Sequence, residues 1–438
     1  MLPSRKHRRF APTGALALAR IARRVVIAVG VILCAFPALA RDIQVRDASE
    51  FQRVLKTVTG GDRLLLQGGE YGKLSLWAKG KIDPRFDKPV TIQSIDPKRP
   101  AIFTGLTLNT ARNITFHQIV FDYRAKPGTF KERPFEIKNS NNITITGSLF
   151  DGDNARGAGE RANGYGAGLG LALRKSNAIR VENNVFRNFH RGLTMGSGDG
   201  NIVRGNNLSG MRSDGMNFVK VTNLRIENNY IHNFRRNMAA GDHADMIQFW
   251  TNGAKTPTTD VTIKGNILHI GSGDHTQSLF MRNEAVDSQG GGKAMFYRNI
   301  VIEDNVIING HLHGITMGAT NGLKIRNNTL VRTPRRGAAA APKGRGPKHW
   351  MPRIKVAENS INVTLENNIA PQIRNVQDGW KVKGNLAIQD IALMEPGHYT
   401  QVFQNGLAKA PYALENFITK PGGVADKRGL GAAQLSKR

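Results

Sequence analysis

The chain has very little cysteine, and this limits the chemistry that it can carry. Its 438 residues include one cysteine, Cys34. A single cysteine cannot form an internal disulfide, and Cys34 falls inside the N-terminal segment that we expect to be removed (see below). The sequence therefore excludes a disulfide framework, a thiol nucleophile and a thiolate metal site in the mature protein.

Acidic residues are absent from the N-terminus, and long apolar runs are absent from the rest of the chain. The first 40 residues carry seven arginines and lysines and no acid, then an apolar stretch from Val25 to Phe36, then small residues ending at Ala40. This order predicts a secretory signal peptide over residues 1–40 that is cleaved after Ala40. No later segment approaches ~18 apolar residues, so we expect a periplasmic or secreted protein without stable membrane insertion.

Basic residues greatly outnumber acidic ones. The 62 lysines and arginines against 33 aspartates and glutamates give a net charge of +29, and removing the seven basic residues of the signal leaves about +22 (55 − 33). An exported protein with this charge attracts polyanions, and outside the cytoplasm the expected polyanions are acidic polysaccharides. No nucleic-acid motif is present, so nucleic acid is not an expected partner. The alternative is that the charge serves only solubility or wall adhesion.

A short pattern of alternating apolar residues followed by asparagine recurs along the chain. Weaker copies without the asparagine begin at Ile114 and Ile143. The shortest spacings between copies are 22 and 23 residues, and the longer ones fit the same unit plus a loop. The copies begin at Ile179, Ile202, Leu224, Val261, Ile300, Leu323 and Val363, and their asparagines are Asn184, Asn207, Asn229, Asn266, Asn305, Asn328 and Asn368.

This repeat predicts an all-β solenoid. Alternation of apolar residues is strand periodicity, and the Asn-Asn and Gly-Asn pairs that follow are turn residues that tolerate positive φ. Short strands repeating every ~22 residues describe the coils of a parallel β-helix, in which we expect the asparagines to stack as a structural ladder. Beyond about residue 375 the repeat fades.

The domain boundaries follow from where the repeat begins and ends. Residues 41–75 are expected to form an N-terminal cap with the first strands, including a helix over Ser49–Val58 with Ser49 as its N-cap. Residues 76–375 form the β-helix, and residues 376–438 form a C-terminal cap and tail. Excursions from the coils are expected at 151–168, 234–243, 254–259, 284–293 and 334–352.

The cap segment GGDRLLLQGGEY (60–71) and the repeated coils through Asn368 resemble the pectate-lyase-like superfamily of right-handed parallel β-helix proteins. The resemblance covers most of the mature chain. It implies a right-handed coil and an activity on polysaccharides, since the superfamily includes lyases, glycoside hydrolases, C5-epimerases and phage tailspikes. No motif of a single lyase family is intact.

A second strand in each coil carries the candidate site. Aligning 190–195, 213–218, 244–249, 276–281 and 312–317 places apolar residues inward and the alternate residues outward. Arg212, His243, His275 and His311 form a column just before these strands. Asp242, Asp214, Asp245 and His313 lie beside that column, and we expect substrate contacts from Arg212, Asp214, Asn217, Gln248, Trp250, His311 and His313.

These residue types fit β-elimination on an acidic polysaccharide. That reaction needs a cation for the sugar carboxylate, a base for the C5 proton and an acid for the leaving oxygen. The predicted catalytic set gives His243 or His275 as base, Asp242 or Asp245 to orient it, and Arg282, Arg212 or Lys220 to hold the carboxylate. Related lyases that use lysine or arginine as base keep Lys220 and Arg282 as alternatives for that role.

Several alternatives remain open at this point. The same residues suit a C5-epimerase, which shares the proton abstraction, or a hydrolase that uses two of the aspartates. A non-catalytic polysaccharide-binding protein would use the same basic groove. A divalent cation such as calcium, if one is bound, would be held by Asp242, His243, Asp245 and His275. We expect a monomer.

Overall fold

The computed structural model describes residues 40–241, 243–274, 276–333, 351–395, 397–406 and 413–436. Residues 1–39 of the predicted signal peptide (1–40) and residues 334–350 of the predicted excursion (334–352) lie outside the described residues. Residues 40–438 form one compact unit, whose internal arrangement follows. No helix in the described part is long and apolar enough to cross a membrane.

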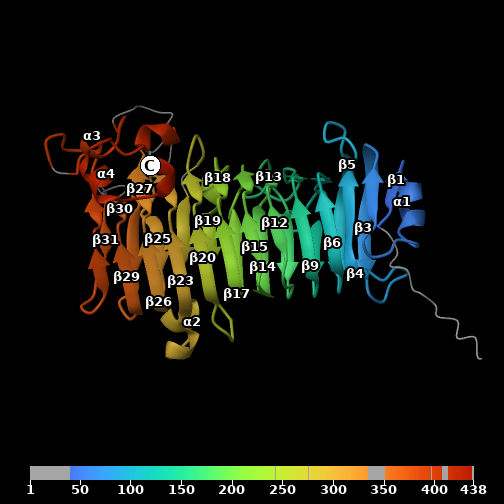
Figure 1. The fold of residues 1–438 in the computed structure, drawn as a ribbon, viewed down its shortest axis with the longest axis horizontal. Helices are drawn as coiled ribbons and strands as arrows, with labels where there is room; N and C mark the ends of the chain where they lie inside the picture. Colours follow the sequence, from blue (N-terminus) through green and yellow to red (C-terminus); the bar gives the residue numbers. More distant parts are fainter. Residues whose placement is uncertain are drawn as a thin grey trace, which may run out of the picture. The chain divides into compact units, whose positions relative to one another are not determined.

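The strands pair in parallel from one coil to the next and form three stacks (Figure 1). The first stack, which carries the candidate site, contains β3 (Gly69–Trp77), β5 (Ala101–Asn109), β8 (Phe135–Lys138), β11 (Leu169–Arg174), β14 (Arg191–Asp199), β17 (Met216–Glu227), β19 (Asp245–Phe249), β22 (Gln277–Met281), β25 (His313–Met317), β28 (Arg353–Val356) and β31 (Ile373–Arg374). The second contains β1 (Asp42–Val45), β2 (Arg63–Leu66), β4 (Arg85–Ser94), β6 (Arg112–His117), β9 (Asn141–Thr146), β12 (Arg180–Glu182), β15 (Ile202–Arg204), the end of β17, β20 (Thr259–Lys264), β23 (Tyr297–Glu303), β26 (Thr320–Arg326), β29 (Ile361–Glu366) and β32 (Lys381–Lys383). The third contains β7 (Val120–Asp122), β10 (Leu149–Asp151), β13 (Val185–Arg187), β16 (Asn207–Ser209), β18 (Tyr230–His232), β21 (Ile267–His269), β24 (Val306–Asn309), β27 (Thr329–Arg332), β30 (Ile369–Ala370) and β33 (Leu386–Ala387). The predicted all-β parallel β-helix is confirmed.

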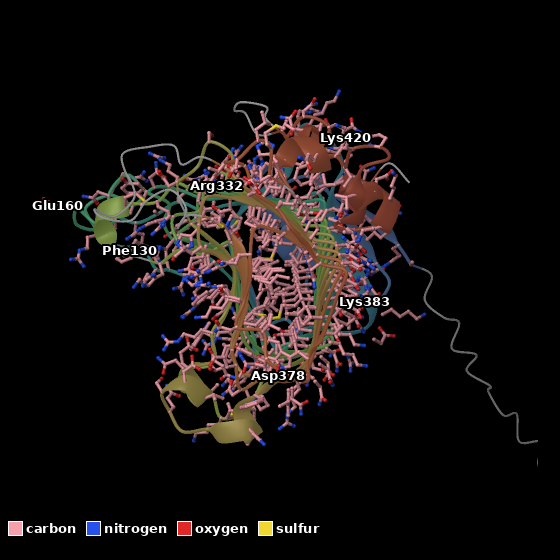
Figure 2. All side chains as sticks on the ribbon, turned by 90° about the vertical axis from the view of Figure 1, so that its left-hand side faces the viewer. Phe130, Glu160, Arg332, Asp378, Lys383 and Lys420 are labelled. Carbon is pink, nitrogen blue, oxygen red and sulfur yellow. The ribbon has the colours of Figure 1, made fainter. Side chains whose placement is uncertain are left out.

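Alternation of side chains fills the inside of the coil. In β20, Val261 and Ile263 are buried while the residues between and beside them are partly or fully exposed. The same position recurs in each coil, so like residues stack, as Phe150 does on Phe186 with ring centroids 4.4 Å apart. Figure 2 shows the carbon-rich interior that results. A single coil cannot bury these side chains by itself. Repeated coils bury them by stacking, which is why the repeat specifies the fold.

The N-terminal cap contains the predicted helix, but its capping residue differs from the prediction. Helix α1 spans Ala48–Val54, and its N-cap is Asp47, whose carboxylate accepts a hydrogen bond from the Glu50 N–H at 2.8 Å. Ser49 lies inside the first turn. Aspartate is as good an N-cap as serine, and Asp47 has the extended backbone that the position needs. Phe51 on the buried face packs against Tyr71 of β3.

Asparagines stack at the turn between the second and third strand stacks, as predicted, with one exception. The residue before each ladder asparagine is Asn, Asp or Gly with φ between 53° and 73°, a conformation that these residue types tolerate best. From Asn206 onward, each side chain accepts hydrogen bonds from the asparagine one coil earlier and donates to a backbone carbonyl, while the first rung, Asn184, accepts from the Ser148 N–H at 2.9 Å. The ladder consists of Asn184, Asn206, Asn229, Asn266, Asn305, Asn328, Asn368 and Asn385.

The prediction of Asn207 as a ladder member was wrong by one residue. Val203, not Ile202, pairs with Val181, so the second copy of the repeat begins at Asn201. Asn201 is buried, and its side-chain oxygen accepts a hydrogen bond from the Ile179 N–H at 2.8 Å. Because strand side chains alternate between faces, a slip of one residue exchanges buried and exposed positions. A polar residue at an inward position hid the true start of this copy.

A second column, on the outside of the second stack, alternates in charge over eight coils. The strand register aligns Glu182, Arg204, Glu227, Lys264, Glu303, Arg326, Glu366 and Lys383. Glu303 forms ion pairs with both neighbours: its Oε1 lies 2.9 Å from Lys264 Nζ and its Oε2 lies 2.6 Å from Arg326 Nε. Opposite charges on neighbouring coils favour this register over its alternatives.

The C-terminal residues pack on the outside of the third stack. They contain α3 (Tyr399–Val402), η4 (Leu414–Phe417), α4 (Val424–Arg428) and η5 (Ala433–Leu435), drawn in red in Figure 1. Phe403 and Phe417 join Val306, Ile308 and Val331 in a separate buried cluster. The outward faces of β24 and β27 are apolar because this segment covers them.

Candidate active site

The strands of the first stack lie in the register that the sequence predicted. The outward positions form a continuous column, in which Asn217 of β17 pairs with Thr194 of β14 and with Gln248 of β19. Phe280 of β22 and Thr316 of β25 continue it. This column is the floor of the candidate site.

A cleft of about 420 Å³, here called the central cleft, opens beside the start of β14, β17 and β19. Its walls come from excursions at different places in the chain: one carries Phe130 and another lies next to Glu160, and both project from the same side of the coil (Figure 2). The lining residues are Phe130, Lys131, Arg161, His190, Arg191, Arg212, Ser213, Asp214, Ala240, His243 and Gln248.

Asp214 anchors the central cleft without being open to solvent. Its carboxylate pairs with the Arg191 Nε at 2.9 Å and accepts hydrogen bonds from Asn217 Nδ2 at 3.0 Å and Ser213 Oγ at 3.3 Å. Burial raises the pKa of Asp214, and the charge of Arg191 opposes that rise. The predicted substrate contact is therefore a buried group that holds Arg191, whose side chain remains 38% exposed to the cleft.

Asp245 occupies the same position as Asp214 on the next coil. It is fully buried, and neither of its carboxylate oxygens has a hydrogen-bond partner among the described residues. Burial raises the pKa of Asp245 well above its usual range, and the neighbouring charge of Asp214 raises it further. Burial thus favours the protonated form of Asp245. Among the described residues, no contact of these oxygens supports the predicted catalytic role of orienting a histidine.

The two imidazoles that line the cleft differ in their surroundings. His243 is exposed and lines the cleft. His190 is buried edge-on to Phe130, and burial lowers its pKa to about 3, helped by the charges of Arg191 and Arg212. Both residues precede the start of a first-stack strand, so it is the packing of Phe130 on His190 that distinguishes the two rings.

Two further predicted histidines lie next to each other on β25 and the turn before it. The rings of His311 and His313 stack with centroids 5.3 Å apart, and His313 Nδ1 is 2.8 Å from Thr316 Oγ1. Burial lowers the pKa of His313 to about 4, with contributions from Arg353, Lys355 and His243 in that order. The predicted column of Arg212, His243, His275 and His311 stays a prediction, because His275 lies outside the described residues.

Lys220, within β17, and Trp250, just after β19, line a separate hollow. Trp250 Nε1 donates a hydrogen bond to Asn217 Oδ1 at 2.5 Å, while Asn217 Nδ2 donates to Gln248 Oε1 at the same distance. Asn217 therefore links this hollow to Asp214 in the central cleft. The hollow is lined by Arg174, Lys175, Gly196, Ser197, Val219, Lys220, Trp250, Asn252, Gly253 and Ala254.

Arg282 directly follows β22, and the pairing of Phe249 with Met281 places it one coil on from Trp250. The Arg282 Nε is 3.2 Å from Asp287 Oδ2 of α2 (Glu284–Asp287), an ion pair within the excursion that also holds η2 (Gly292–Met295). Arg282 is not among the residues that line the central cleft. Its side chain remains 51% exposed despite this ion pair, and its catalytic role stays a prediction.

Two predicted residues, Asp242 and His275, lie outside the described residues. They make up half of the predicted metal set, together with His243 and Asp245. In the part of the chain that the structure describes, no group of three or more His, Cys, Asp or Glu side chains is placed to hold a metal ion.

The sequence reasoning missed much of the cleft wall. Lys131 and Phe130 belong to an excursion between β7 and β8 that was not predicted, and Arg161 comes from the predicted excursion after residue 151. Phe130 fixes its excursion by packing under the Arg212 guanidinium, 5.0 Å from the ring centroid. The run PGTFKERP (127–134), between two strands, was the available signal.

Comparison with known proteins agrees with this fold. Residues 135–329 match the family described as right handed beta helix region. Similar solved structures include an alginate lyase from Paenibacillus sp. str. FPU-7 (11% identity, 78% of this chain and 97% of that one, TM-score 0.30) and a rhamnogalacturonan lyase (12%, 83% and 90%, 0.41). The Dettilon tailspike protein is also similar (14%, 80% and 63%, 0.49). No curated protein matches the sequence.

The protein has the right-handed parallel β-helix fold that its cap segment and repeats implied, and the family match over residues 135–329 agrees with it.

Proposed function

We propose that the protein is an exported polysaccharide lyase that cleaves an acidic, uronic-acid-containing polysaccharide by β-elimination in the central cleft. The observation that supports this most is the charge of the cleft. Lys131, Arg161, Arg191 and Arg212 line it, against one carboxylate among the described lining residues, Asp214. A cleft with this excess of positive charge attracts anionic sugars and stabilises negative charge that develops during reaction.

The first requirement of β-elimination is neutralisation of the uronate carboxylate, so that the C5 proton becomes acidic. Arg191 suits this task, because Asp214 holds its Nε and the rest of the guanidinium faces the cleft. A guanidinium can bind a carboxylate through two parallel hydrogen bonds. Lys131 adds positive charge from the opposite wall, where it lies 5.1 Å from the Phe130 ring centroid.

The second requirement is a base. His243 is the exposed imidazole of the cleft, and imidazole is the side chain that most often moves a proton in enzymes. The base takes the C5 proton, the C5–H electrons form the C4–C5 double bond, the C4–O bond breaks, and the leaving oxygen takes up a proton. Buried His190, whose pKa is about 3, is a weak base, and we assign it to shaping the wall beside Phe130.

A glycoside hydrolase is less well supported. Hydrolysis needs two carboxyl groups facing the scissile bond. Asp214 is 1% exposed and occupied by Arg191, and Asp245 is 0% exposed. A C5-epimerase uses the same base and the same cation and is the nearest alternative, and a binding protein without catalysis is the next.

The test is a screen of uronic-acid polymers with the full-length mature protein, followed by ultraviolet absorbance of the unsaturated product, with and without a chelator. We expect product, and we expect His243→Ala to lower kcat by about 10²–10⁴-fold. His117→Ala on β6, in the second stack, is the matched control and should keep parental activity. Solvent hydrogen at C5 without chain cleavage would indicate the epimerase, and reducing ends without absorbance the hydrolase.

Export, a monomeric state and an acidic polysaccharide partner are parts of the same proposal. The mass of the mature N-terminus from an exporting host tests cleavage after Ala40, and light scattering of the purified protein tests the monomer. Activity that is lost with chelator and restored by calcium would add a metal to the site.

A further inference from the structure

A second basic hollow, here called the N-terminal hollow, lies on the same strand stack as the central cleft. It has a volume of about 720 Å³ and is formed by β3, β5 and the excursion between β7 and β8. Strand pairing runs from β5 through β8 and β11 to β14 at the central cleft. At ~4.8 Å per coil, the three steps separate the two sites by about 14 Å.

The N-terminal hollow contains two cations, Lys73 and Arg133, for which the described residues provide no ion pair. Arg124 pairs with Glu70 and Asp122, and Glu132 is engaged by the Tyr123 hydroxyl at 2.8 Å. By contrast, the described part of the chain holds no ion pair to Lys73 or Arg133, which also line the hollow. These two cations are therefore available to an anionic ligand.

The floor of the hollow suits a sugar chain. Ser75 and Thr107 offer hydroxyl groups and pair with each other across β3 and β5. The register leads from Thr107 to Asn217 in the central cleft through Glu136, whose carboxylate pairs with Lys138 and Arg174, and then through Ala172 and Thr194. Gly105 makes room for Lys73: a Cβ at that position would lie 3.1 Å from Lys73 Cγ. The lysine stem thus crosses the strand where a side chain is missing.

One excursion builds both sites. Phe130 and Lys131 line the central cleft, while Arg133 and Pro134 line the N-terminal hollow. A chain lying along the outward column passes both faces of this excursion. The central cleft and the N-terminal hollow therefore form two basic sites along one extended binding surface.

We propose that the N-terminal hollow is a distal anion-binding site that holds a second uronate of the same polysaccharide chain, several sugars from the bond that is cleaved. This inference rests on the proposed function for its ligand class. It implies that the protein prefers long polyuronates over short oligomers, because only long chains reach both sites.

The experiment compares Lys73→Ala/Arg133→Ala with the parent protein, using uronate oligomers from disaccharides to long polymer. Lys324→Ala/Arg298→Ala, which removes the same charge from β26 and β23 on the second stack, is the control. We expect the KM and the dissociation constant for long polymer to rise about tenfold in the first variant, in line with the loss of two charge-assisted contacts. Values for disaccharides, and kcat on all substrates, should stay at parental level.

Equal affinity of parent and variant for long polymer overturns the inference, as does an equal loss for disaccharides or an equal loss in the control. Binding is measured by affinity electrophoresis as well as by turnover, so the two proposals can fail separately. Unsaturated product without any length effect removes the distal site alone. A length effect without product removes the lyase alone, and no binding of any polyuronate removes both.

Discussion

Asn206 and Asn207 are adjacent in sequence, and the structure gives them opposite importance. Asn206 is 1% exposed and belongs to the ladder, whereas Asn207 is exposed and starts β16. Replacing each in turn with alanine tests whether the stability comes from the hydrogen bonds of the ladder or from any asparagine at this turn. We expect Asn206→Ala to be strongly destabilising and Asn207→Ala to be nearly neutral.

The size of the effect follows from the hydrogen bonds that the Asn206 side chain makes. Its Oδ1 accepts from the Asn184 N–H at 3.0 Å and from Asn184 Nδ2 at 3.1 Å, and its Nδ2 donates to Val181 O at 2.8 Å and Asn229 Oδ1 at 2.9 Å. Truncation leaves two buried donors of Asn184 unpaired. At about 1–3 kcal/mol for each unsatisfied buried group, the free energy of unfolding should fall by about 3–5 kcal/mol.

The control value is small because Asn207 makes one exposed contact. Its Oδ1 lies 2.9 Å from His232 Nε2, and losing a solvated hydrogen bond costs about 0.5 kcal/mol. For about 400 residues, an unfolding entropy of about 2.1 cal/mol/K per residue converts 3–5 kcal/mol into a fall in Tm of about 4–6 °C. Calorimetry and urea denaturation of both variants check this.

Equal shifts for the two variants would refute the ladder as the source of the stability. A larger shift for Asn207→Ala would restore the start of the repeat at Ile202 that the sequence pattern predicted. Asn385→Ala, at the part-buried last rung, should fall between the two, because it breaks the same kind of bond nearer to solvent.

Three further predictions follow from single contacts. Glu303→Lys puts a third cation between Lys264 and Arg326 and should lower the free energy of unfolding by about 1 kcal/mol in low salt, less in high salt, since both partners are about half exposed; a salt-independent loss would contradict this. The pKa of His190 is about 3, below the ~6.5 of an unfolded imidazole, so this residue costs up to about 1.4 kcal/mol of stability per pH unit as the pH falls from about 6.5 towards 3. Urea denaturation at several pH values should show a flatter slope for His190→Gln and the parental slope for His117→Gln. Trp250→Phe removes the indole donor to Asn217 and should raise KM several-fold with kcat kept; an unchanged KM would detach that hollow from the substrate track.

The fold was predictable because its information is local. Alternation in segments such as Val261–Ile263 and a turn residue before each ladder asparagine repeat at short spacing, and parallel pairing then forces like positions into columns. The register of Asn217, Gln248 and Thr316 followed from the same rule. It failed at Asn201, where a buried amide replaced an apolar residue and its contact to Ile179 lies on another coil.

The walls of the site were not predictable in the same way. Phe130 reaches Arg212 across more than eighty residues of chain, and Arg161 comes from a different excursion. Neither excursion repeats from coil to coil, so no periodicity in the sequence predicts its position. Loops of this kind carry function because a rigid scaffold positions them, and their placement depends on a few long-range contacts such as that of Phe130.

The roles of the aspartates, however, were implicit in the strand alternation. Asp214 stands two residues before inward Met216, and Asp245 two before inward Ile247, so the pattern that placed the apolar residues inside also placed these carboxyls inside. Burial of a carboxylate is costly unless a cation pairs with it, and Arg191 is the cation that pairs with Asp214. The buried aspartates are therefore not the groups that contact substrate. Asp214 holds Arg191 in place, and Arg191 and the exposed imidazole of His243 face the sugar. Asp214→Asn should accordingly weaken substrate binding through a displaced Arg191 rather than abolish proton transfer, a KM effect larger than the kcat effect, and the reverse split would make Asp214 the catalytic group itself.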